Sequence, residues 1–71
     1  MLLTGTVVSV SEDNGITMAK VNAHGAIIHV SLALVPNARE GTRILAEGGV
    51  AISIIKQEEL EEEQHVPRNS R

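Results

Sequence analysis

The chain has 71 residues with no cysteine and no Phe, Tyr or Trp, so it can build one small domain around an aliphatic core, without disulfides or thiolate metal sites. A formal net charge of -3 argues against a nucleic-acid partner, because phosphates require a basic surface, and the lack of aromatic side chains removes base stacking. No apolar run is long enough to span a bilayer and no signal peptide is recognisable, so we expect a cytoplasmic protein without membrane contacts.

β-Branched residues predominate from Leu2 to Val10, which predicts the first strand. In a regular strand Val8 and Val10 share one face, and Val7 lies on the other. Gly5 lies inside this strand, where a glycine indicates a bulge or the close approach of another backbone.

A two-residue turn is predicted to connect the first strand to the second. Asn14 and Gly15 both tolerate a positive φ, which makes this dipeptide a strong hairpin signal. The second strand is predicted from Ile16 to Asn22, and its alternation places Ala19 and Val21 towards the core.

The third strand is predicted from Ala26 to Leu32, after a turn at Ala23 to Gly25. Alternation places Ile28 on the core side, and Ile27 with His29 on the opposite side. An exposed isoleucine there should be covered by a neighbouring segment or a partner chain.

The connection to the fourth strand is predicted from Ala33 to Gly41, where Leu34 and Val35 are expected to close one end of a barrel. Two more strands follow, from Thr42 to Ala46 and from Val50 to Lys56, with a Gly-Gly turn between them.

The five strands predict a mainly β fold, a small five-stranded OB-like β-barrel over residues 1–56. Good helix formers in residues 57–64 predict a short acidic C-terminal helix, and residues 65–71 are predicted to be a disordered tail.

No residue pattern indicates catalysis, a metal site or a cofactor. The histidines, His24, His29 and His65, lack partners at the spacing of metal ligands, and no nucleophile motif is present. Five carboxylates between Glu58 and Glu63 indicate either a solvated helix or an acidic docking site for a basic partner. We therefore expect a protein that is not an enzyme.

Four apolar residues are candidates for an exposed surface: Leu2, Leu3, Ile27 and Ile54. They either cap the ends of the barrel or bind a partner or a second copy of the chain.

Six segments follow one another along the chain in a distinctive order: Ala19-Lys20-Val21, Val30 to Val35, Gly41, Ile44 to Ala46, Gly49 to Ser53 and the acidic stretch from Glu58 to Glu63. Their order and spacing resemble those of the HypC/HupF hydrogenase maturation chaperones. The resemblance implies an OB-type barrel with a C-terminal helix. It also implies a scaffold role in [NiFe]-hydrogenase assembly, through binding to a HypD-like maturation protein or the hydrogenase large-subunit precursor.

The sequence departs from this family at two positions. Family members begin Met-Cys, and that cysteine is the proposed iron ligand and partner contact; here the chain begins Met1-Leu2-Leu3 and, aligned on Gly5, is about two residues shorter. Glu47 occupies the position of a family histidine. Because a thiolate is a soft ligand for low-valent iron and a carboxylate is not, we expect protein binding without iron delivery.

The residues expected to contact a partner are Met1, Leu2, Leu3, Gly5, Ile27, His29, Glu47 and Gly49. The alternative interpretation is an oligomeric structural or regulatory barrel with no role in iron delivery.

Overall fold

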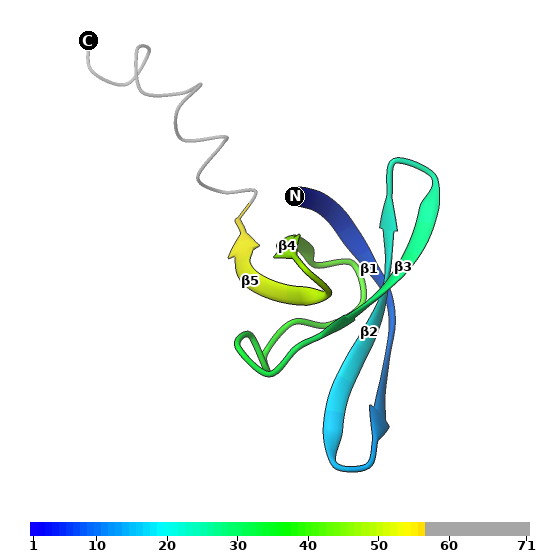
Figure 1. Ribbon diagram of the computed structural model, residues 1–71, viewed down its shortest axis with the longest axis vertical. Coiled ribbons are helices and arrows are strands. Elements are labelled where there is room, and N and C mark those ends of the chain that lie inside the picture. Colours follow the sequence, from blue (N-terminus) through cyan, green and yellow to red (C-terminus); the bar gives the residue numbers. More distant parts are fainter. Residues whose placement is uncertain (57–71) are drawn as a thin grey trace, which may run out of the picture.

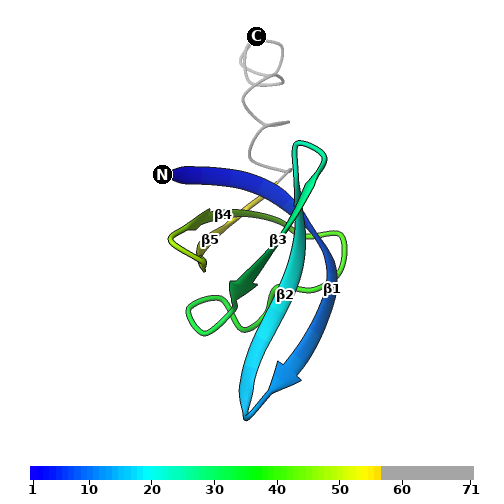
Figure 2. The ribbon, with the colours of Figure 1, turned by 45° about the vertical axis from the view of Figure 1, so that its right-hand side comes forward.

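A computed structural model describes residues 1–56 of the chain, so the predicted helix and tail at residues 57–71 lie outside the described residues. The strands are β1 (Leu2–Asp13), β2 (Ile16–Ala23), β3 (Ala26–Ser31), β4 (Arg43–Glu47) and β5 (Val50–Ile55). They form a closed barrel in the order β1-β2-β3-β5-β4, and β4 pairs back to β1 (Figures 1 and 2). The predicted five-stranded β-barrel is confirmed. Within residues 1–56 there is no helix with the length and apolar character needed to cross a membrane.

Strand β1 takes part in both halves of the barrel. Its residues 2–6 pair with β4, and its residues 6–13 pair with β2 in a hairpin that projects away from β4 and β5 (Figure 1). Gly5 lies next to Thr6, the residue at which the pairing of β1 passes from β4 to β2. A Cβ at this position would be 2.5 Å from Cγ1 of Val21 and 2.7 Å from the carbonyl oxygen of Asn22. The glycine is therefore required by the close approach of β2, one of the two alternatives that its position in the sequence indicated.

Three hairpins have two-residue turns, and β1 and β2 are longer than predicted because pairing continues up to these turns. Both central residues have a positive φ, as a type I′ turn requires, at Asn14-Gly15, His24-Gly25 and Gly48-Gly49. Such a turn allows pairing up to its flanking residues. Asp13 thus pairs with Ile16, and β1 ends at Asp13 rather than at Val10.

A β-bulge at Val8 changes which side chains of β1 share a face of the sheet. The register shifts between Val7 and Ser9, so that Val7 is opposite Val21 and Val10 is opposite Ala19. Since residues directly opposite each other share a face, Val7 and Val10 lie on the same side. The prediction that Val8 and Val10 share a face was wrong, because it assumed unbroken alternation.

The core is aliphatic, as the composition predicted, and Leu32 and Ile44 are among its largest fully buried side chains. Ala19 and Val21 are both buried, which confirms the inward face of β2. The other buried hydrophobic residues are Val7, Ala23, Val30, Val35, Ala38, Ala46 and Ala51.

The loop before β4 closes the barrel with one of its two predicted residues. Val35 is buried, whereas Leu34 is 64% exposed. The N–H of Val35 donates to the carbonyl of Leu32 at 3.0 Å, so the chain turns tightly here and neighbouring side chains point in different directions. The expectation that Leu34 closes the barrel was wrong for this reason.

Candidate functional site

The beginning of β1 lies against the end of β4. Leu2 is directly opposite Glu47, and Glu47 is opposite Val50, so these residues form a line across three strands. The backbone nitrogen of Met1 is 3.7 Å from Oε2 of Glu47. Both groups of this ion pair are well exposed, so it adds little to stability. We name Met1, Leu2, Glu47 and Val50 the end row.

The end row has an apolar part that is accessible to a partner. Met1 is 90% exposed and Leu2 is 57% exposed, while Val50 is half-buried. Side chains that are directly opposite on neighbouring strands lie on the same face of the sheet. The row therefore presents apolar groups around one carboxylate, a combination suited to contact with another protein.

Two other residues predicted to contact a partner lie deeper in the barrel. Leu3 is half-buried and pairs with Ala46, a buried residue. Gly5 is buried under β2. Of the four apolar candidates, Ile54 is partly buried and packs against the core, so only Leu2 and Ile27 are strongly exposed. Leu3 and Gly5 are therefore less accessible to a partner than Met1 and Leu2 are.

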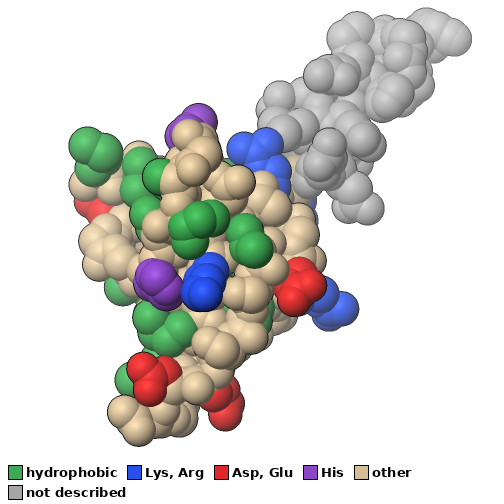
Figure 3. Space-filling view, turned by 90° about the vertical axis from the view of Figure 1, so that its right-hand side faces the viewer, with side chains coloured by type: hydrophobic (Ala, Val, Ile, Leu, Met, Phe, Trp, Pro, Cys, Tyr) green, Lys and Arg blue, Asp and Glu red, His purple; other side chains and the backbone are tan. Residues whose placement is uncertain are grey.

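The remaining predicted partner residues lie at the β4–β5 turn and on β3. Gly49 is exposed in the turn, and its carbonyl accepts a 2.9 Å hydrogen bond from the N–H of Ser31. Ile27 is 52% exposed, and His29 is exposed opposite Lys20. Figure 3 shows one face of the molecule on which basic side chains (Lys or Arg) and His side chains lie beside hydrophobic ones. The exposed residues among those predicted thus form two groups, the end row with its adjoining turn and the outer side of β3.

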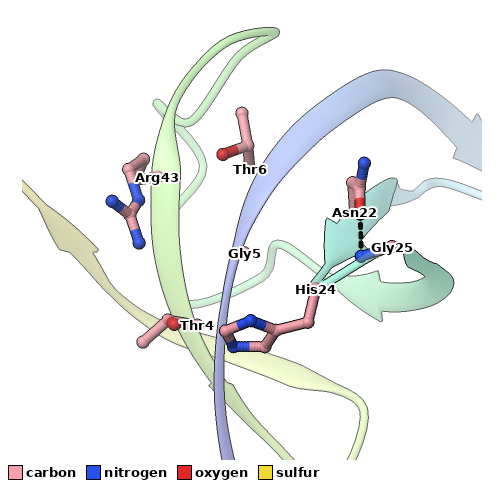
Figure 4. Close-up of a pocket in the computed structure, with 7 residues that line it drawn as sticks. All are labelled: Thr4, Gly5, Thr6, Asn22, His24, Gly25 and Arg43. Carbon is pink, nitrogen blue, oxygen red and sulfur yellow. Dashed lines mark hydrogen bonds between the residues drawn. The ribbon is translucent and has the colours of Figure 1, made fainter.

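A shallow pocket of about 330 Å³ lies between β1, β4 and the β2–β3 turn (Figure 4). Its lining residues are Thr4, Gly5, Thr6, Asn22, His24, Gly25 and Arg43. The Oδ1 of Asn22 accepts a 2.8 Å hydrogen bond from the N–H of Gly25, which fixes the rim of the pocket. Only Gly5 of this set was predicted to be functional. The others were missed because the pocket arises from the register of three strands, which no local motif specifies.

The chemistry available to this part of the chain is that of binding. No group of three or more His, Cys, Asp or Glu side chains within residues 1–56 is placed to hold a metal ion. Among the same residues, no polar or charged side chain is buried. The end row offers an amine and a carboxylate but no thiolate. Low-valent iron favours soft ligands, so the described residues do not fit an iron centre.

A small closed barrel with an exposed apolar row has the features of a module that binds other proteins. The HupF/HypC family model matches residues 3–66, and the chain belongs to the HupF/HypC family. The predicted family is thereby confirmed. A search of curated proteins found no match. The family consists of hydrogenase maturation chaperones, which are accessory proteins that work on protein partners rather than catalytic enzymes.

Proposed function

We propose that this protein binds a HypD-like maturation protein or the precursor of a hydrogenase large subunit, and that it does so without carrying iron. The pairing of Leu2 with Glu47 is the observation that supports this proposal most directly. The start of β1 and the end of β4 are the segments in which the family resemblance expects its cysteine and histidine. Their proximity means that one surface can be retained while its metal-binding groups are replaced.

The exposure of the end row supports a protein contact. Met1 and Leu2 present apolar surface that no other part of residues 1–56 covers. Truncating or charging an apolar residue at the centre of an interface typically weakens binding strongly, whereas peripheral changes do not. Leu2 is therefore the residue at which the proposal is most sensitive to substitution.

A binding measurement with two matched variants tests the proposal. The HypD-like protein and the large-subunit precursor of the same host are purified, and each is titrated with wild-type protein, Leu2→Asp and Leu34→Asp. We expect wild type to bind one of them and Leu2→Asp to bind at least about tenfold more weakly. Leu34 is 64% exposed and lies outside the end row, so Leu34→Asp should bind within about twofold of wild type.

Two results would contradict the proposal. If wild-type protein binds neither candidate, the proposed partners are wrong. If Leu2→Asp and Leu34→Asp weaken binding equally, the end row is not the centre of the interface. Metal analysis of anaerobically purified protein tests the second half of the proposal, because stoichiometric iron would show that the chain holds iron without a thiolate.

A further inference from the structure

The junction between β3 and β5 is short. Within the described residues these parallel strands share one pair of opposed residues, Ser31 and Val50. Residues 26–30 pair with β2 on one side and have no strand partner on the other side among residues 1–56. Strand β3 therefore has an edge at which another strand can add.

The turn before β3 determines which backbone groups lie at this edge. Ala23 and Ala26 flank a two-residue turn, so they form a hydrogen-bonded pair and the groups of Ala26 point towards β2. Alternation then directs the N–H and C=O of Ile27, His29 and Ser31 away from β2. The N–H of Ser31 does bond to Gly49, as this pattern requires. Four groups, two on Ile27 and two on His29, thus face the open edge.

The sequence of β3 has none of the features that usually prevent strand addition. Natural edge strands carry charged residues, Pro or bulges. Strand β3 reads AIIHVS, with no Lys, Arg, Asp, Glu or Pro, and Ile27 is 52% exposed. By contrast β5 is followed closely by Lys56 and five glutamates between residues 58 and 63, which would repel the same segment of a second copy. Charge therefore favours β3 over β5 for self-association.

We propose that the β3 edge pairs in antiparallel fashion with the same edge of a second copy of the chain. A two-fold axis through Ile28 sets Ile27 of one protomer opposite His29 of its partner. Both residues of this pair have outward backbone groups, so all four groups of each edge form intermolecular hydrogen bonds. No like charges oppose each other, because β3 carries no acidic residue, Lys or Arg.

This dimer is independent of the proposed hydrogenase function. None of the end-row residues belongs to β3, and no maturation partner is needed to observe self-association. The interface is short, so we expect the apparent mass to rise from 7.6 kDa towards twice that value as protein concentration increases from about 10 μM to about 1 mM.

Amide hydrogen exchange on the full wild-type chain tests the edge without substitutions. The amides of Ile27 and His29 should exchange more slowly at high protein concentration, in step with the mass measured by analytical ultracentrifugation. The amide of Ser31 is bonded within the barrel and should be protected at both concentrations. Protection of Ile27 and His29 in a strict monomer would mean that the chain's own residues 57–71 cover the edge, and would overturn the proposal.

Two double variants test the register. In the dimer, residue 27 of each protomer is opposite residue 29 of the other. The double variant Ile27→Lys with His29→Glu therefore places opposite charges in both of these pairs, and the double variant Ile27→Glu with His29→Glu places like charges in both. The first variant should dimerise at least as well as wild type, and the second should dimerise at least about tenfold more weakly. Equal dimerisation of both variants, dissociation of both, or a wild type that remains monomeric at about 1 mM would each overturn the proposal. Far-UV circular dichroism checks that both variants are folded.

Discussion

Position 5 requires a glycine because β1 pairs with β4 there and also passes very close to β2. It pairs with Ile44 of β4, while β2 crosses so closely that a side chain would meet both Val21 and the backbone of Asn22. A side-chain neighbour can move, but a backbone carbonyl in a ladder cannot move without disturbing its strand. The constraint therefore depends on tertiary packing and not on a turn conformation.

Gly5→Ala should destabilise the protein by about 1–3 kcal/mol, because the added methyl overpacks the crossing. Val21→Ala in the same chain removes the 2.5 Å contact but leaves the 2.7 Å contact with Asn22, so it should restore only part of the lost packing. The free energy of unfolding in urea, followed by circular dichroism, measures both effects. A Gly5→Ala variant as stable as wild type would show that β2 does not approach this closely.

Two isoleucines on neighbouring strands should differ strongly in their contribution to stability. Ile44 is fully buried, so Ile44→Ala should cost about 2–5 kcal/mol through lost burial and a cavity. Ile52 is 39% exposed, and Ile52→Ala should cost about 1 kcal/mol or less. Urea unfolding of the two variants checks this difference, and similar costs would contradict the assignment of Ile44 to the core.

Among the structural elements, the type I′ turns were the most predictable. The turns at Asn14-Gly15 and Gly48-Gly49 consist of residue types that tolerate a positive φ, so the sequence alone indicates them. The bulge at Val8 could not be predicted, because nothing about that valine differs locally from its neighbours, and the register arises only when β1 meets β2. The exposure of Leu34 likewise depends on a tight turn that carries no glycine signal.

The candidate site could be predicted only in part, because it too depends on how the strands pair. The family resemblance identified Leu2 and Glu47 one by one, and the pairing of β1 with β4 was needed to place them opposite each other. The row also includes Val50, which was not among the residues predicted to contact a partner. Arg43 and Thr6, in the pocket, depend on the same pairing.

The β2–β3 turn offers a direct test of turn chemistry. His24 has a φ of 57°, a conformation that asparagine tolerates better than most residues and that valine strongly disfavours. His24→Val should lower the unfolding free energy by about 1–2 kcal/mol. His24→Asn should leave it unchanged or raise it slightly. Thermal unfolding compares the variants, and equal stability of both would contradict the left-handed conformation at this turn.

At the scale of the whole molecule, the charges are distributed unevenly along the chain. Residues 1–56 contain four Lys or Arg and four Asp or Glu, so the net charge of -3 comes from residues 57–71. The barrel lacks a strong field of one sign, and the one ion pair found within it is exposed. Electrostatics therefore have little influence on whether the barrel is folded.

Salt should accordingly have a small effect on stability. Raising NaCl from about 0.05 M to about 0.5 M should change the free energy of unfolding by less than about 0.5 kcal/mol, because exposed and balanced charges are already well screened. Circular dichroism is the suitable probe, since the chain has no Trp or Tyr to give intrinsic fluorescence. A change of several kcal/mol would indicate strong charge interactions within the barrel.

The position of the end row on the β1–β4 ladder has a thermodynamic consequence. This ladder joins the N-terminal part of β1 to the sheet, so a partner bound across Leu2 and Glu47 must dissociate before the two strands can separate. At a free partner concentration of about 100 times Kd, this linkage adds about 2.7 kcal/mol to the free energy of unfolding. For a domain of this size that is a large fraction of the total stability. A partner protein bound at this row would thus protect the chain from unfolding and proteolysis, and the cellular lifetime of the chain would depend on the abundance of that partner.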